Sequence, residues 1–252
     1  MITSNGLPYF GRGNSKLPDS TLTFALPSGY TCPGALQCLA KADRITGAII
    51  DGPAQIFRCY EASIESLRPS VRSRRWANYD LLRNKRSTSM AELLLAGIAA
   101  TRDHKSSHVR WFTGGDFYSE ELRDAIMLAT RATPDLIHYA YTKNLPLFAP
   151  NAERLIALPD NFRLTASWGG RFDRLLEAGL FPRTARVLNT RQEAETLGLP
   201  IDTSDRLAWQ EQPSHFCHLS HGTQPSGSAA GRAIHARRRS GDFSGYGAKR
   251  KS

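Results

Sequence analysis

The segment His108–Thr142, HVRWFTGGDFYSEELRDAIMLATRATPDLIHYAYT, decides the fold class of this 252-residue chain. It contains two apolar runs, His108–Thr113 and Leu136–Thr142, on either side of an amphipathic stretch, Ser119–Thr130. The two runs have the length and composition of buried strands, and the stretch between them has helical spacing. Two strands joined through a helix lie parallel, because a parallel pair needs a long crossover connection. The segment therefore predicts a βαβ unit whose helix begins at Ser119.

Further βα units follow this segment. Strands are predicted at Asn161–Ser167 and Thr184–Asn189. Helices are predicted before, between and after them, at Asn151–Leu158, Arg171–Ala178 and Gln192–Leu197. This succession predicts an α/β fold in which parallel βα units form either an open sheet or a partial TIM-like barrel.

The part of the chain before this α/β segment has a different composition. Residues 1–30 are rich in Gly, Pro, Ser and Asn, and only Thr21–Leu26 alternates as a short strand does, which predicts an extended N-terminal arm. Ala48–Asp51 and Ala54–Tyr60 predict a hairpin around Gly52-Pro53.

Two basic helices are predicted next, at Ser63–Arg83 and Thr88–Arg102, with Ser63 and Ser89 as N-caps. Beyond Trp209 the chain loses its periodicity. We therefore expect an arm at residues 1–30, an α/β domain at 31–210 with a cysteine-containing insertion at 31–60 and basic helices at 63–102, and a Cys/His segment with a basic flexible tail at 211–252.

The composition limits the class of protein. Hydrophobic residues make up 40% and charged residues 22% of the chain, which is a globular balance and excludes a wholly disordered or fibrous protein. No stretch approaches the roughly 18 apolar residues of a membrane span. The N-terminus, MITSNGLPYF, lacks a basic region followed by an apolar one, so we expect a protein with no membrane partner in a reducing cytoplasm.

The positive charge of the chain is concentrated in two clusters. The chain has 33 Lys and Arg against 23 Asp and Glu, a formal charge of +10. Seven basic residues stand between Arg68 and Arg86 against Asp80 alone, and seven more stand between Arg232 and Lys251 against Asp242 alone. Such clusters either bind a phosphate backbone, here of DNA, or form solvated surfaces. The candidate nucleic-acid-binding residues are Arg68, Arg72, Arg74, Arg75, Arg83, Lys85, Arg86, Arg237, Arg238 and Arg239, with Trp76 and Tyr79 as candidate stacking partners for bases.

Four cysteines are candidate metal ligands. Cys32 and Cys38 lie close together beside the turn residues Pro33-Gly34, Cys59 follows them, and Cys217 lies far down the chain. Four thiolates suit either Zn²⁺ or an iron–sulfur cluster, and the spacing matches no standard motif of either. Unpaired thiols, some of them in the core, are the alternative. His218 and His221 are alternative ligands beside Cys217.

Polar residues follow the predicted parallel strands. Asp116 comes after Gly114-Gly115 at the end of one strand, and Tyr141 and Lys143 end the next. Ligands bind at the carboxyl ends of parallel strands, so these three residues are the candidate catalytic group. Lys143 would pair with the carboxylate or bind phosphate. In the alternative, Asp116 caps the following helix and Lys143 is solvated.

Several short motifs together resemble the gene-88 protein family of bacteriophages. They are Asn14-Ser15-Lys16-Leu17-Pro18, Thr31-Cys32-Pro33-Gly34-Ala35, Arg58-Cys59-Tyr60, Arg74 to Asn78, Gly114-Gly115-Asp116-Phe117, Tyr141-Thr142-Lys143 and Asn161-Phe162-Arg163-Leu164. The resemblance implies a phage or prophage protein inside the host cell and brings no activity with it. Members of the family carry several closely spaced cysteines near the C-terminus, whereas this chain has Cys217 alone there. In ground plan the chain is also similar to guanine transglycosylases, whose barrels present aspartates at strand ends and whose zinc motif is not matched here.

Three functions are consistent with these features. The first is an enzyme acting on DNA or a nucleotide, in which base exchange would use Asp116 as nucleophile or base, Lys143 as a phosphate contact and Tyr141 as a stacking surface. The second is a radical- or redox-type enzyme with a cysteine-bound iron–sulfur cluster. The third is a non-catalytic DNA-binding protein with structural zinc. Metal analysis and Asp116→Asn distinguish them.

Overall fold

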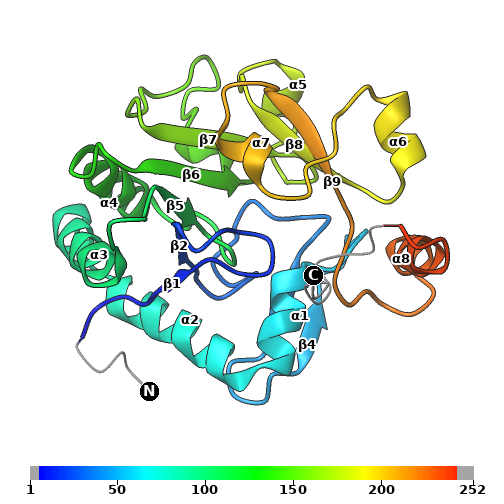
Figure 1. Cartoon of the computed structure of the whole chain (residues 1–252), viewed down its shortest axis with the longest axis horizontal. Coiled ribbons are helices and arrows are strands. Elements are labelled where there is room, and N and C mark those ends of the chain that lie inside the picture. The colour runs from blue at the N-terminus through cyan, green and yellow to red at the C-terminus, as the bar shows by residue number, and fades with distance from the viewer. Residues whose placement is uncertain (1–5, 243–252) are drawn as a thin grey trace.

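The computed structural model describes residues 6–242, which form an open seven-stranded sheet covered by helices (Figure 1). The strand order is β1-β2-β5-β6-β7-β8-β9. All neighbouring pairs are parallel except β1 and β2, which are antiparallel. The strands are β1 (Phe10–Arg12), β2 (Thr21–Phe24), β5 (His108–Trp111), β6 (Ile137–Thr142), β7 (Phe162–Ser167), β8 (Thr184–Leu188) and β9 (His215–Leu219). The sheet ends at β1 and β9, so the predicted open sheet is confirmed and a TIM-like barrel is not shown.

The predicted βαβ unit is present. Helix α4 (Glu120–Arg131) joins β5 to β6, and the Ser119 side chain accepts a hydrogen bond from the Leu122 amide at 3.2 Å, as an N-cap does. Helix α3 (Ser87–Thr101) packs against α4, and the two lie side by side beside the sheet in Figure 1.

The other helices are short or lie outside the sheet layer. Helices α1 (Tyr60–Leu67) and α2 (Pro69–Leu82) run below β1 and β2 in Figure 1, and α8 (Ala229–Arg239) lies at the right of that view. A second sheet pairs β3 (Ala40–Ala42) with β4 (Ile49–Asp51). The remaining elements are η1 (Leu145–Leu147), α5 (Arg174–Glu177), α6 (Arg191–Thr196) and α7 (Arg206–Trp209).

A run of aromatic side chains forms the centre of the hydrophobic core. The rings contact one another edge to face or tilted, with centroids 4.7 to 6.1 Å apart. Such contacts stabilise a core beyond the burial of apolar area alone. The rings belong to Phe10, Phe24, Trp111, Phe112, Phe117 and Phe148. Because Phe10 and Phe24 lie on β1 and β2, residues expected in an extended arm are part of the core.

Two predictions for the helices at residues 63–102 are wrong. The single helix at Ser63–Arg83 is two helices, because Pro69 disfavours helical geometry at Arg68, where φ is −126° and ψ is 93°. Neither Ser63 nor Ser89 is an N-cap, since α1 begins after Cys59 and α3 after Arg86.

The predicted hairpin is formed by a different pair of strands. Strand β4 pairs with β3 and not with Ala54–Tyr60, which forms no strand. The turn is made by Asp43, whose Oδ1 accepts the amides of Ile45 and Thr46 at 3.0 and 2.7 Å. This Asx turn at Asp43, and not Gly52-Pro53, joins the two strands of the hairpin.

Two predictions for the chain beyond residue 150 also need correction. Asn151–Leu158 is not a helix, because Ala152 has a positive φ of 54° and Pro159 disfavours helical geometry at Leu158. The segment expected to be a loose tail contains β9 and α8. Lys249, Arg250 and Lys251 lie outside the described residues. None of the helices in residues 6–242 combines the length and the apolar character that a membrane span requires.

Lowering the pH is expected to destabilise the fold through His138. Its Nδ1 accepts a hydrogen bond from the Trp111 indole at 3.1 Å, and its Nε2 lies 2.9 Å from the Thr133 hydroxyl. Burial lowers the pKa of His138 to about 3, whereas a histidine in an unfolded chain titrates near 6.5. Between these values only the unfolded state binds the proton, so stability is lost as the pH falls below about 6.5.

We expect His138 to contribute about 2 kcal/mol to the loss of unfolding free energy between pH 7 and pH 5. Urea unfolding of the wild type and of His138→Gln at both pH values measures it. The variant should lose less stability on acidification, and an equal loss in both proteins would contradict the assignment.

Candidate functional site

Five parallel strands end around one pocket with a volume of about 190 Å³. Strands β5, β6, β7, β8 and β9 contribute Arg110, Tyr141, Ser167, Val187 and His218 to its lining. These residues lie in the carboxyl-terminal halves of their strands, where open parallel sheets bind ligands. Further lining residues come from outside the strands, among them Lys16, Cys38, Arg58, Cys59, Tyr60, Lys143, Asp205 and His221.

Asp205 is the charged centre of one wall of this pocket. Its Oδ1 accepts a hydrogen bond from the Lys16 ammonium, and its Oδ2 lies 3.0 Å from Nε of Arg110. Burial alone would raise the pKa of Asp205, but the charges of Lys16 and Arg110 outweigh burial and hold the pKa below its usual range. Asp205 also has a left-handed backbone, with φ at 61°, which is uncommon outside glycine and frequent at functional sites. The pocket therefore contains a carboxylate that stays ionised.

Tyr141 and His218 extend this network. His218 Nδ1 lies 3.1 Å from the carbonyl oxygen of Asp202 and so carries the proton, which leaves Nε2 as the acceptor 3.1 Å from the Tyr141 hydroxyl. Burial lowers the pKa of His218 to about 3, so the ring is neutral at physiological pH. The Tyr141 hydroxyl also lies 3.4 Å from Oδ1 of Asp205.

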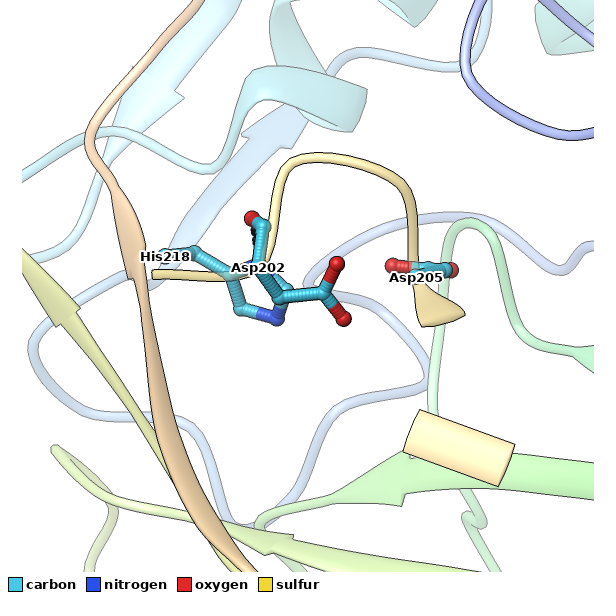
Figure 2. Close-up of side chains that lie close together, drawn as sticks. All are labelled: Asp202, Asp205 and His218. Carbon is cyan, nitrogen blue, oxygen red and sulfur yellow. Dashed lines mark hydrogen bonds between the residues drawn. The ribbon is translucent and has the colours of Figure 1, made fainter. Parts of the chain in front are cut away.

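Asp202, Asp205 and His218 form a candidate metal site. Their ligand atoms lie within 4.8 Å of one another, and in Figure 2 the Asp202 carboxylate points toward Asp205 with the His218 ring beside it. The Asp202 carboxylate, however, already accepts the amides of Ser204 and Leu207, and Asp205 is already neutralised by Lys16. A divalent cation would have to displace the Lys16 ammonium, so the arrangement fits an internal ion-pair network better than a metal centre.

Lys143 supplies a further positive charge in the lining of the pocket. The residue is 8% exposed, and its ammonium donates to the Trp168 carbonyl and lies 3.3 Å from the Ser167 hydroxyl. Within residues 6–242, no carboxylate lies within 4.0 Å of it. A buried ammonium with no carboxylate in direct contact is costly unless a ligand provides a counter-ion.

Asp116 lies behind Lys143 and does not line the pocket. Its Oδ1 accepts the Phe117 amide at 2.7 Å and its Oδ2 accepts the Lys143 amide at 2.9 Å. Burial raises the pKa of Asp116 to about 6, against the opposing effects of these hydrogen bonds and of the Lys143 charge. The carboxylate therefore fixes the backbone of Lys143, and the helix cap of α4 is Ser119 instead.

Glycine is required where the cysteine-bearing loop crosses Lys143. A Cβ atom on Gly34 would lie 2.1 Å from the Lys143 carbonyl oxygen, so no other residue fits at this crossing. The contact holds the loop that carries Cys32 and Cys38 against the end of β6.

Three of the four cysteines approach one another beside this pocket. Cys38 and Cys59 line it, and the Cys59 amide donates to the Cys38 carbonyl at 3.2 Å. Burial is the main cause that raises the pKa of the Cys32 thiol. The charges of Asp116, Cys59 and Cys38 raise this pKa further, so Cys32 lies close to the other two cysteines. Cys217 is not part of this group, because it precedes His218 on β9 and faces the other side of the sheet, where its sulfur lies 3.8 Å from the Leu199 carbonyl oxygen.

One family description matches almost the whole chain. The family model "Gene product 88" matches residues 8–241. The chain belongs to the gene product 88 family. No curated protein and no solved structure matches it, and the similarity to transglycosylases is not confirmed.

The candidate nucleic-acid-binding residues of this gene product 88 chain fall into two groups. Arg72, Arg75 and Arg237 are buried, and their guanidinium groups are bound to backbone carbonyls or to buried carboxylates. These three stabilise the fold and are not available to phosphates. The exposed members are Arg68, Arg74, Arg83, Lys85, Arg86, Arg238 and Arg239. Trp76 and Tyr79 are half-buried and contact each other edge to face.

Sequence reasoning missed the ion-pair network of this gene product 88 chain. Lys16 and Asp205 are separated by 189 positions, and neither belonged to the predicted catalytic group. Lys16 and Arg58 did occur in motifs of the family resemblance, which was the one available signal for them. The structure brings Tyr141 and Lys143 into the pocket with them.

Proposed function

We propose that the strand-end pocket is the active site of an enzyme that acts on a nucleotide or on DNA, with Lys143 as the contact for a phosphate group. The observation that carries this proposal is the buried ammonium of Lys143, which lacks a carboxylate partner among the described residues. Phosphate is the common anion that an isolated ammonium binds in enzyme sites.

The other charges of the pocket support an anionic substrate. Lys16, Arg58 and Arg110 join Lys143 in the lining, and Asp205 is the only acidic lining residue. Tyr60 and Tyr141 supply aromatic surface for a base. Together these groups suit a molecule with a flat ring at one end and a phosphate at the other.

If the reaction is base exchange, Asp205 is better placed than Asp116 to act as the nucleophile. Its carboxylate oxygen would form a bond to the sugar carbon while the bond to the departing base breaks, and the base would leave with the electron pair and take up a proton. An incoming base would reverse these steps. Lys16 and Arg110 keep Asp205 ionised, and Asp116 holds Lys143 in position.

Ligand binding tests the proposal directly. Thermal unfolding and calorimetry should show that dGMP and inorganic phosphate stabilise the protein, while deoxyguanosine stabilises it much less. A ligand present at a free concentration of about 100 times its Kd adds about 2.7 kcal/mol to the unfolding free energy. Equal responses to nucleoside and nucleotide, or no response to any phosphate compound, would contradict the proposal.

A second candidate function is an iron–sulfur enzyme, and the convergence of Cys32, Cys38 and Cys59 favours it. Cys38 and Cys59 line the pocket and Cys32 lies close to both, so a cluster held by these thiols would supply electron transfer beside the pocket.

Iron and acid-labile sulfide analysis of protein purified without oxygen tests this candidate. We expect Cys32→Ser, Cys38→Ser and Cys59→Ser each to lose bound iron, and the matched control Cys217→Ser to retain it. Stoichiometric zinc with the same cysteine dependence would indicate structural zinc, and no metal in any sample would contradict both metal assignments.

A further inference from the structure

We infer that a groove leading into the pocket binds single-stranded nucleic acid and delivers its end nucleotide to Lys143. This inference rests on the proposed function and narrows its substrate to a strand longer than one nucleotide. The groove, called here the approach groove, consists of two adjoining hollows with volumes of about 430 and 230 Å³, and the larger of them adjoins the pocket.

Shared lining residues join the hollows into one path. The larger hollow shares Lys16, Tyr60 and His221 with the pocket. It shares five residues with the smaller hollow, namely Gly13, Thr23, Val71, Arg75 and Thr113. The approach groove therefore runs between the N-terminal strands and helices α1 and α2, which lie below those strands in Figure 1.

The charge along this path favours a polyanion. Seven basic residues line the two hollows and the pocket, against two acidic residues, Glu61 and Asp205, and one of the seven, Arg75, is enclosed by Glu61 and Glu65 and contacts no phosphate. Arg12 and Arg58 are paired with carboxylates from outside the lining. Arg74, at the far end, has no carboxylate within 4.0 Å among the residues that the structure describes. An exposed and uncompensated guanidinium there can contact a phosphate.

Aromatic side chains stand at both ends of the approach groove. Tyr9 is 38% exposed, and the Arg74 guanidinium lies 4.6 Å from its ring centroid. Tyr60 stands at the junction with the pocket, where its ring centroid lies 4.3 Å from that of His221. Unpaired bases stack on aromatic rings while basic residues contact the backbone between them. The alternation of aromatic and basic side chains along the groove therefore favours a nucleic acid over an acidic peptide, which has no bases to stack on the rings.

A single strand fits the path better than a duplex. The bases of a duplex are stacked inside it, and an enzyme reaches them only after flipping one out. A single strand can place each base on Tyr9 or Tyr60 without that cost. We therefore expect selectivity for single strands.

Fluorescence anisotropy with a labelled dT12 strand and a 12-base-pair duplex tests the inference. The full chain should bind the single strand more tightly than the duplex at equal salt. Tyr9→Ala should weaken binding of the strand about 5- to 100-fold, and Tyr9→Phe should restore it. Arg74→Gln should weaken binding and reduce the slope of log K against log salt by about 0.7, the value for one lost phosphate contact.

The matched control is Arg131→Gln, which removes the same charge from an exposed position on α4 outside the groove. Equal affinity for strand and duplex, or equal effects of Arg74→Gln and Arg131→Gln, would overturn the inference, as would poly-glutamate binding with the same dependence on Tyr9. Binding of dGMP separates the two proposals. If dGMP binds and dT12 binds no more tightly, the groove assignment fails and the pocket assignment stands; if neither binds, both fail.

Discussion

Replacing Arg75 with methionine is expected to lower the free energy of unfolding by about 3–5 kcal/mol. Arg75 forms ion pairs with Glu61 and Glu65, and the three side chains are 7%, 8% and 0% exposed. Burial opposes the charge on Arg75, but the charges of the two glutamates outweigh burial and raise its pKa. Removal of Arg75 would leave two buried carboxylates without a counter-ion.

The Arg75 cluster also connects segments that are distant in the sequence. The Glu65 Oε1 atom accepts the Ser28 amide at 2.8 Å and lies 2.6 Å from Nη1 of Arg75. A Cβ on Gly114 would lie 2.4 Å from Nη1 of Arg75, so the loop after β5 packs directly on the guanidinium. Loss of Arg75 should therefore loosen the contact between α1, α2 and the strand ends.

Urea unfolding at pH 7 measures the effect of Arg75→Met, with Arg68→Met as the control, since Arg68 is exposed and forms no ion pair with any residue that the structure describes. The control should change stability by less than about 0.5 kcal/mol. Adding Glu61→Gln and Glu65→Gln to Arg75→Met should recover part of the loss, because no uncompensated charge then remains. A loss under 1 kcal/mol for Arg75→Met, or no recovery, would show that the cluster does not act through its buried charges.

Replacing Lys143 with methionine is expected to weaken binding of dGMP about 10- to 100-fold, as a lost hydrogen bond between charged groups does. Methionine keeps the length and apolar stem of lysine and removes the ammonium. The ligand-free variant should be no less stable than the wild type, because it no longer buries an ammonium that lacks a carboxylate partner among the described residues.

The two readouts together identify a binding role. Calorimetry gives the affinity for dGMP, and urea unfolding without ligand gives the stability. The matched control Lys105→Met removes an exposed lysine from the turn before β5 and should change neither. If Lys143→Met loses stability and keeps its affinity for dGMP, Lys143 is a structural residue and the phosphate contact lies elsewhere.

The sequence predicted the main elements of the sheet to within a few residues. The apolar runs at His108–Thr113 and Leu136–Thr142 correspond to β5 and β6, and the helix between them starts where the serine cap placed it. Periodicity and caps are local signals, which is why they were sufficient here. Strand β9 and helix α8 were missed because their segment carries Gly, Pro and Ser between short apolar stretches.

Tertiary structure decided which of the candidate residues share a site. The parallel order of the strands followed from the βα pattern, and it placed Tyr141 and Lys143 at one edge of the sheet. Only the folded arrangement brought Lys16 to Asp205 and directed Cys217 away from the other cysteines.

Tertiary structure also decided which arginines are exposed, because a run of arginines in the sequence does not show which guanidinium groups become buried. Arg74 and Arg75 are neighbours on α2, yet one is exposed beside Tyr9 and the other is enclosed by two glutamates. Successive residues on a helix point in directions about 100° apart, so their environments are set by whatever packs on each face. Local periodicity therefore determined the elements of this protein, and the packing of distant segments determined its site.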